Sequence, residues 1–466
     1  MSKSTDKKKE NPAKFIICSL LGVFLFFTPI PDGDGAFNIF LGIVINWLNY
    51  LFSNIEFGYY APDTMDGTLI FSYGIALAAI SVSFLGTVVA QTFKPKFIMN
   101  NPSLKNIFVT SPVYFATRAI AFAIVWMFFA NNGPQSVIHA FTGDVVIGLV
   151  AGLVTIFLVF PMLMPLLTEF GLMEFLGTLV RKFVRKLFTL PGRASVDLMA
   201  SWFGSSVVAV LITGSQLNKG FYTRREAAVS ATNFATVSVP FTFIVVSQIG
   251  IQAHFLIFYV VMSLTVIALA LIMPRIWPLR NIPNTYIEDV GKQIKEDVPL
   301  EGALFATAVK TASAQANKTT KKDFLSSVKD NYLSMFLDLL PIILAWGTFA
   351  LMINELTDIF EWVSQPMGYY LQLLQIEGAF DYAPATLVGF ADMFIPAILL
   401  GSAPLHTQFV LGVLSIVQLI YLAETGALII KSKIPLSVSK LFIIFMMRTL
   451  IGLPIIVLLT RLLFNP

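Results

Sequence analysis

The chain has very few of the residues that build disulfides and metal centres. It holds one cysteine, Cys18, and three histidines that lie far apart in the sequence. A single cysteine excludes an intramolecular disulfide and a cysteine-based metal cluster, and scattered histidines do not favour a metal site. Nothing in the sequence resembles an ATP-binding module. The net charge of +4 does not indicate nucleic-acid binding. We therefore expect no cofactor and no nucleic-acid partner.

Charged residues are also scarce, whereas apolar residues dominate. Of 466 residues, 12% are charged and 56% are hydrophobic, and the mean hydropathy is +0.78. Apolar stretches near or above ~18 residues recur, which is long enough to cross a hydrocarbon core of ~30 Å. The basic N-terminus is followed by an apolar stretch without a small-residue cleavage site, which predicts an uncleaved first span. The fold class predicted by this composition is an all-α polytopic membrane protein.

The placement of lysine and arginine predicts the topology, because these residues mark the cytoplasmic side of short loops. Segments 31–66, 131–142 and 354–383 contain neither residue and are expected outside. The N-terminus and the loop 276–330 are expected in the cytoplasm, and the C-terminus outside. Alternation between the two sides predicts spans near 15–30, 67–90, 111–130, 143–167, 226–249, 254–275, 332–353, 406–429 and 439–463.

Three apolar segments do not fit this alternation. Segments 196–217 and 384–405 must leave and return on one side, so each is predicted to be a re-entrant hairpin. Non-helical backbone at membrane depth is tolerated only where it is buried in protein or lines a wet cavity. Segment 35–53 is predicted to be an interfacial helix, since its aromatic and amphipathic residues favour the headgroup boundary.

The order of elements repeats along the chain. ASWFGSSVVAVLITGS at 200–215 aligns with LVGFADMFIPAILLGS at 387–402. Each half runs span, amphipathic helix, hairpin, broken span and span, in opposite predicted orientations. An inverted repeat with paired broken helices is typical of a secondary transporter, whose substrate binds where the repeats meet. The predicted divisions are an N-terminal scaffold at 1–135, a first repeat at 136–275, a flexible cytoplasmic linker at 276–330 and a second, inverted repeat at 331–466.

Polar residues in the predicted breaks supply the candidate site. The substrate-binding candidates are Ser201, Trp202, Ser205, Ser206, Asn233, Thr236, Asp392, Glu424 and Thr425. The ion-coupling candidates are Thr232, Asn233, Ser238 and Glu424. A carboxylate inside a membrane is costly to bury, so its default interpretation is functional.

Arg448 is the basic residue predicted to lie deepest in the membrane, and it leaves open an alternative role for the two carboxylates. In that alternative it forms a structural ion pair with Glu424 or Asp392. Arg118 and Asp338 lie near the ends of their spans, and we expect both side chains to snorkel to the membrane surface.

The two break regions resemble those of a known group of proteins. ASWFGSSVVAVLITGSQLNKGFYTRREAA and GFADMFIPAILLGSAPLHTQF are similar to the gate stretches of GATE-domain (nucleoside-recognition) membrane proteins. The whole chain resembles the YjiH-type members. That group is similar in architecture to concentrative nucleoside transporters, which implies substrate between the hairpin tips and the breaks at 232–238 and 424–426. Its resemblance to spore-maturation membrane proteins implies a small membrane partner with its own gate segment.

The sequence therefore predicts an ion-coupled secondary transporter in the inner (plasma) membrane, driven by protons or sodium. Its substrate is expected to be a small polar solute such as an amino acid, small peptide or nucleoside. We expect a homo-oligomer or a complex with a small GATE-domain protein. One alternative is a non-transporting partner subunit. Another is an intramembrane hydrolase with Asp392 and Glu424 as a carboxylate pair, although no nucleophile elbow or metal-ligand spacing accompanies them.

Overall fold

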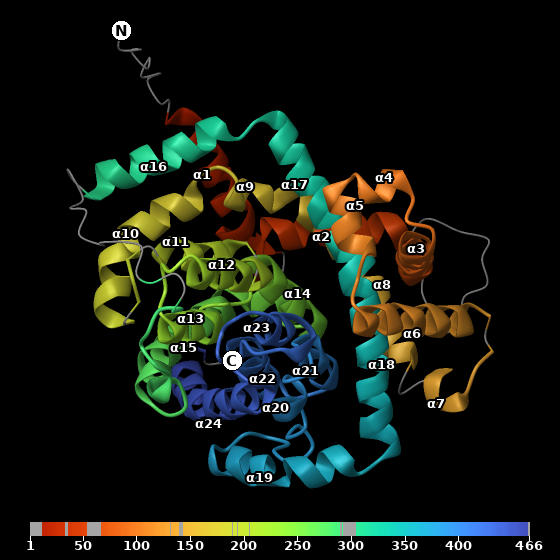
Figure 1. The fold of residues 1–466 in the computed structure, drawn as a ribbon. Helices are drawn as coiled ribbons and strands as arrows, with labels where there is room; N and C mark the ends of the chain where they lie inside the picture. The colour runs from red at the N-terminus through yellow and green to blue at the C-terminus, as the bar shows by residue number, and fades with distance from the viewer. Residues whose placement is uncertain are drawn as a thin grey trace.

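The computed structural model describes residues 12–32, 36–53, 67–130, 132–138, 143–188, 190–192, 194–204, 206–288, 291 and 304–464. These residues are almost entirely helical (Figure 1). Six helices are long and apolar enough to cross a membrane: Phe71–Thr92, Pro112–Phe129, Val146–Thr168, Gln252–Arg275, Lys321–Ile353 and Val438–Leu463. The predicted polytopic helical architecture is thus confirmed, and the chain is a multi-pass membrane protein.

The N-terminal part contains helices and one small ribbon. Its elements are α1 (Ala13–Phe27), β1 (Pro29–Asp32), β2 (Ala36–Ile39), α2 (Phe40–Ser53), α3 (Gly67–Thr92), α4 (Lys96–Met99), α5 (Pro102–Phe108), α6 (Pro112–Phe129) and α7 (Gln135–Ile138). Strands β1 and β2 pair antiparallel, with Pro29 opposite Ile39. The ribbon was not predicted, and it takes up the start of the segment expected to be interfacial. The rest of that segment is α2, which exposes Trp47 and Tyr50.

The next part, up to residue 281, contains two interrupted helical regions. Its elements are α8 (Gly143–Leu163), α9 (Pro165–Thr168), α10 (Leu172–Leu187), α11 (Ala194–Phe203), α12 (Ser206–Asn218), α13 (Arg224–Asn233), α14 (Val239–Ile249), η1 (Gln252–His254), α15 (Phe255–Ile272), η2 (Met273–Arg275) and η3 (Leu279–Asn281). The predicted span 226–249 is therefore two helices, separated at 234–238. A capping box between Thr223 and Glu226 begins α13.

The last part begins at residue 304 and also contains interrupted helical regions. Its elements are α16 (Leu304–Lys318), α17 (Lys321–Ser334), the π-helix η4 (Met335–Leu339), α18 (Leu340–Leu356), α19 (Ile359–Leu373), α20 (Ala385–Val388), α21 (Phe394–Leu399), α22 (Leu405–Val417), the π-helix η5 (Leu422–Gly426), α23 (Ala427–Lys431) and α24 (Val438–Leu463). Helices α17, η4 and α18 run as one long column through the molecule (Figure 1). The predicted span 406–429 is again broken, at 418–421.

The prediction of a flexible tether is wrong for residues 304–330, because α16 and α17 lie there. Ala308, Ala312 and Ala316 are fully buried and recur every four residues on one face of α16. This face packs on α10 and α1. Gly171, at φ +91, allows the close approach, since a Cβ there would lie 2.3 Å from the Ala312 carbonyl oxygen. The low-complexity alanines thus form a close-packed helix face.

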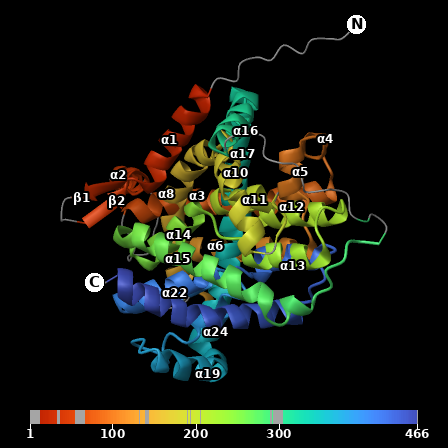
Figure 2. The same cartoon turned by 90° about the vertical axis from the view of Figure 1, so that its left-hand side faces the viewer.

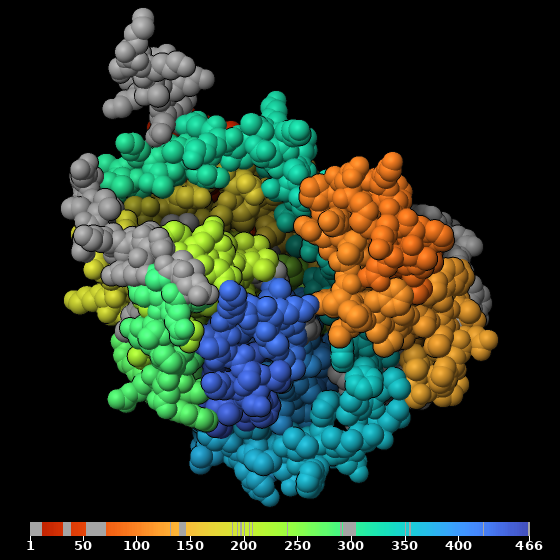
Figure 3. All heavy atoms as spheres, viewed as in Figure 1, coloured from red at the N-terminus to blue at the C-terminus, as the bar shows by residue number. Residues whose placement is uncertain are grey.

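The N-terminal helices α3 and α6 pack against α8 of the next part and α18 of the last part. Figure 2 shows α1, α2 and the ribbon on the opposite side of the molecule from α4 and α5. In Figure 3 the orange residues of α3–α6 form a lobe beside the yellow-to-blue body that carries both broken regions. The candidate site lies within that body.

Candidate functional site

The first part contributes two breaks that are tied together. Helix α11 ends at Phe203 and α12 begins at Ser206, and Ser201 precedes this break. The Ser201 hydroxyl donates a hydrogen bond of 3.0 Å to the carbonyl oxygen of Thr236, which lies in the break between α13 and α14. Both residues are buried. The two breaks therefore adjoin, and one freed carbonyl is already satisfied by a side chain.

The break in the second part is satisfied by its own side chains. The Thr425 hydroxyl donates to the Leu419 carbonyl at 3.0 Å and accepts from the Tyr421 amide at 3.2 Å. The Tyr421 hydroxyl donates to the carbonyls of Ser415 and Ile416. Leu419 has φ +60, a conformation that costs free energy for a branched side chain. Thr425 and Tyr421 thus stabilise the break from within.

Polar groups of the two parts meet at Glu424. The Ser206 hydroxyl, at the start of α12, donates a hydrogen bond of 2.9 Å to Glu424 Oε1 in η5. Close by, the Leu422 amide donates to the Phe390 carbonyl at 2.8 Å. This bond joins η5 to the turn between α20 and α21. Segments more than 200 residues apart in the chain are thereby brought to one place.

Asp392 lies in that same turn and is 6% exposed. Its Oδ1 accepts a hydrogen bond of 2.9 Å from the amide of Phe394, the first residue of α21. A carboxylate here stabilises the positive end of the short helix. Asp392 and Glu424 are close enough to repel each other electrostatically. The arrangement therefore brings two carboxyl groups to the meeting point of the two parts.

Arg448, on α24, is fully buried but bonds to neutral groups. Its Nε and Nη2 donate to the Val417 carbonyl at 2.9 and 2.6 Å, and its Nη1 donates to Asn233 Oδ1 at 2.8 Å. Val417 ends α22 and Asn233 ends α13, so the guanidinium joins the edges of two breaks. In the described part of the chain no carboxylate forms an ion pair with it. The alternative pairing with Glu424 or Asp392 is therefore absent from this conformation.

The other site residues predicted from the sequence differ in whether their polar groups have hydrogen-bond partners. Thr232 donates to the Ala228 carbonyl at 2.8 Å, as membrane hydroxyls often do. Trp202 is half-buried and packs against the apolar core. The Ser238 hydroxyl is 1% exposed and has no hydrogen-bond partner among the described residues. Ser205 lies outside the described residues.

Sequence reasoning missed Gln418, which lies in the second break and is fully buried. Its amide nitrogen donates to the Thr386 carbonyl and the Thr449 hydroxyl, both at 2.8 Å. Its Oε1 is buried without a partner in the described part of the chain and lies against Gly389, where a Cβ would approach it to 2.4 Å. A glutamine inside the apolar run LSIVQLIY was the available signal.

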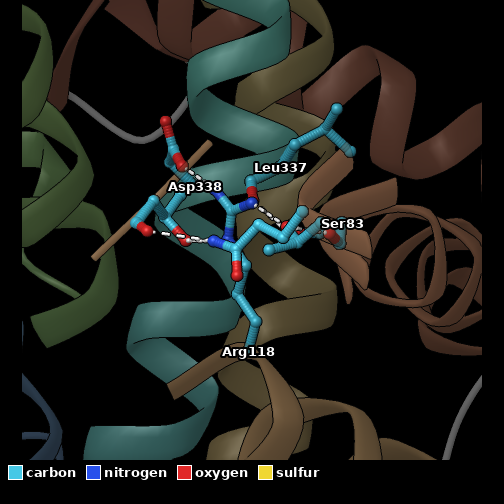
Figure 4. A network of polar contacts seen from close by, with 7 residues as sticks. Ser83, Arg118, Leu337 and Asp338 are labelled. Atoms are coloured by element: carbon cyan, nitrogen blue, oxygen red, sulfur yellow. Dashed lines mark hydrogen bonds and ion pairs between the residues drawn. The ribbon is translucent and has the colours of Figure 1, made fainter. Parts of the chain in front are cut away.

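Arg118 and Asp338 do not snorkel, contrary to the prediction. Arg118 is 1% exposed and forms an ion pair with Asp338 of the π-helix η4 (Figure 4). Arg118 also donates to the Thr87 hydroxyl, and Ser83 donates to the Leu337 carbonyl beside it. Because α6 packs against α3 and α18, the Arg118 guanidinium finds its partners, Asp338 and Thr87, inside the protein.

This pair lies near the candidate site. The hydroxyl of Tyr114, one turn before Arg118 on α6, is within electrostatic range of Glu424, Asp392 and Asp338. The N-terminal helices therefore approach the acidic groups of the second part. Among the described residues no cluster of three histidine, cysteine or acidic side chains could hold a metal ion.

The fold and the site define a multi-pass helical membrane protein in which two broken helical regions meet around buried carboxylates. Residues 150–252 match the family described as Gate, nucleoside recognition. An uncharacterised protein of Alkalihalophilus pseudofirmus is 41% identical over 457 residues, which cover 97% of this chain and 95% of the relative. No solved structure matches the chain. The chain thus contains a Gate (nucleoside-recognition) domain at residues 150–252, which confirms the resemblance to GATE-domain membrane proteins seen in the sequence.

Proposed function

We propose that the protein is an ion-coupled secondary transporter of a small polar solute. The single observation that carries this proposal is the hydrogen bond between Ser206 and Glu424, which joins a break in the first part to a break in the second. Paired interrupted helices that converge on one point are typical of transporter binding sites. The match of residues 150–252 to a family model described as nucleoside recognition supports nucleosides, beside amino acids and small peptides, as a substrate class.

The repeated order of elements supports an inverted repeat, in which α11–α12 and α20–α21 are re-entrant hairpins. Each part contains a long first helix, an amphipathic helix, a helix–break–helix segment, a broken span and a final span. Substrate would bind between the two hairpin breaks and the breaks after Asn233 and Val417. The substrate candidates remain Ser201, Trp202, Ser205, Ser206, Asn233, Thr236, Asp392, Glu424 and Thr425.

Glu424 is the proposed coupling residue. It is hydrogen bonded by a hydroxyl and has no basic partner in the described part of the chain, so a proton or a sodium ion can neutralise it. Thr232, Asn233 and Ser238 would complete an ion site. The unpartnered hydroxyl of Ser238 supports this role, because buried polar atoms normally have a partner.

The test of this function is transport into proteoliposomes by purified protein, with ligands first chosen by a thermal-shift screen. The screen covers amino acids, dipeptides, nucleosides and bases, each with and without sodium, because a bound ligand raises apparent stability by mass action. We expect Glu424→Gln to abolish transport or its dependence on the ion gradient. Glu361→Gln is the matched control, since this carboxylate is exposed on α19.

Two results would contradict the transporter proposal. Full ion-driven transport by the Glu424→Gln variant would show that Glu424 is not the coupling residue. A screen in which no solute stabilises the folded protein, together with stable co-purification of a small membrane protein, would favour the non-transporting partner subunit.

The orientation proposed for the chain places the N-terminus and residue 314 in the cytoplasm and residue 358 outside. It rests on the segments without lysine or arginine. Single cysteines at Ala314 and Asp358, in a Cys18→Ser background, would be labelled by a membrane-impermeant maleimide in intact cells. Labelling is expected at position 358 only. The reverse pattern would contradict both the orientation and the inverted repeat built on it.

A further inference from the structure

A cavity of about 520 Å³ lies where α3 ends and α6 begins. Its walls include the polar residues Gln91, Lys94 and Thr110 and the apolar residues Met99, Val109 and Phe115. This volume is in the range of small-molecule binding sites, about 300–1,000 Å³. The cavity lies outside the site already described, in the N-terminal part of the chain.

The position of the cavity relative to the membrane follows from its walls. Phe71–Thr92 and Pro112–Phe129 are both long enough to span a membrane, and the cavity lies where these two spans end. The short helices α4 and α5 connect them and lie on the surface (Figure 3). The cavity is therefore at the depth where acyl chains give way to lipid headgroups.

The cavity walls are held in place by close packing. Gly86 of α3 lies against the Phe108 ring of α5, which a Cβ at position 86 would approach to 2.4 Å. Phe108 packs with Ala90, Ile98 and Leu337 in a small apolar cluster. The Gln91 amide donates to the Thr110 carbonyl at 2.9 Å, which joins one wall to the other. The polar groups of the cavity thus have fixed positions.

The chain segment that lines the cavity carries only positive charge. Lys94, Lys96 and Lys105 are exposed, and residues 67–143 contain no aspartate or glutamate. None of these lysines forms an ion pair in the described part of the chain. Phe93 and Phe97 beside them are 76% and 68% exposed. Exposed aromatics interleaved with lysines are typical of a membrane–water interface.

We propose that this cavity binds the headgroup of an anionic phospholipid. The Lys94 ammonium would bind the phosphate, and the polar groups of Gln91 and Thr110 would bind glycerol hydroxyls. The acyl chains would extend along exposed apolar side chains of the same two spans, Val89 on α3 and Val113 on α6. The opposite charges of lysine and phosphate, together with the depth of the cavity, select an anionic lipid over a zwitterionic one.

The proposal is tested by native mass spectrometry of the purified full-length chain in a neutral detergent. Short-chain phosphatidylglycerol and phosphatidylcholine are titrated separately, and the apparent Kd of the first bound lipid is measured. We expect tighter binding of phosphatidylglycerol. Lys94→Gln should weaken it by about fivefold, the factor expected for one basic residue near an anionic surface. Val109→Trp, which narrows the cavity from its exposed side, should weaken binding of both lipids.

The matched control is Lys105→Gln, because this lysine is equally exposed but does not line the cavity. Its effect should stay below about twofold, since only the general surface charge changes. Equal losses at positions 94 and 105 would show diffuse attraction and overturn the proposal. Equal Kd values for the two lipids would also overturn it. So would competition by soluble glycerol phosphate at the same concentration as the lipid, which would make the cavity a site for a free anion.

Discussion

The ion pair on α6 and η4 and the acidic groups near η5 both lie within the helical body, but their charges are satisfied in opposite ways. Arg118 and Asp338 neutralise each other. Glu424 and Asp392 instead accept hydrogen bonds from a hydroxyl and an amide, while Arg448 is held by neutral oxygens. A neutral pair needs no further ligand, so it serves structure. Unpaired carboxylates keep a negative charge that a substrate or coupling ion can balance.

The largest effect should come from breaking the ion pair. Asp338→Asn leaves the Arg118 guanidinium buried without a counter-charge. Removal of one partner of a fully buried pair costs about 3–5 kcal/mol, and we expect about 3 kcal/mol here because the Asp338 side chain is 32% exposed. We expect a large fall in the thermal unfolding temperature of the purified protein and lower yield. The double change Arg118→Met with Asp338→Leu removes both charges and should recover most of that stability. An Asp338→Asn protein as stable as wild type would show that the pair contributes nothing.

A smaller effect should follow removal of the Arg448 side-chain donors. Arg448→Met leaves Val417 O and Asn233 Oδ1 without their donors, and each unsatisfied buried acceptor costs about 1–3 kcal/mol. Asn233→Ala, which leaves the two bonds to Val417 in place, should cost less. Thermal unfolding of both variants measures the difference. Equal losses of stability in the two variants would mean that the hydrogen bond to Asn233 alone explains the contribution of Arg448 to stability.

The comparison also separates what the sequence predicts from what it does not. The breaks at Ser201–Ser206 and Thr232–Ser238 were predictable, because polar residues interrupt apolar runs there. The helical linker was not predictable. Its alanines and threonines look like a low-complexity segment in the sequence, and only the structure shows that the alanines pack against α10. The partners of Arg118 and Arg448 lie on helices that are distant in the sequence. The spacing of residues in a single sequence does not predict which of these helices cross. The sequence therefore located the charged groups, and only the structure showed which of them are paired.

Glu424→Gln should change stability by less than about 1 kcal/mol. The glutamine carbonyl can still accept the Ser206 hydroxyl, so the bond that joins the two breaks is kept while a charge is removed from a buried position. Thermal unfolding without ligand measures this value. The contrast with Asp338→Asn is the sharpest test of the comparison, since each variant replaces a partly buried carboxylate by its amide. Equal and large losses in both would mean that Glu424 also has a structural counter-charge.

The smallest effect concerns Glu174, in the first turn of the amphipathic helix α10. Burial raises the pKa of this carboxyl, and Glu169 raises it further while Lys318 lowers it. Its Oε2 has no hydrogen-bond partner in the described part of the chain. A raised pKa means that the folded state binds the proton more tightly than the unfolded state, whose glutamate pKa is about 4.3. The wild-type protein should therefore lose stability as the pH rises from that value through the folded pKa.

Glu174→Gln removes the free-energy cost of holding an ionised carboxyl at this position. The variant should therefore unfold at a slightly higher temperature than wild type at neutral pH. The two unfolding temperatures should converge as the pH falls toward about 4, where the carboxyl is protonated in both states. Glu361→Gln is the control, because this glutamate is exposed on α19 and should give no such pH-dependent difference. A gain at Glu174→Gln that persists unchanged at low pH would come from packing, and the assignment of a burial penalty to this carboxyl would then be wrong.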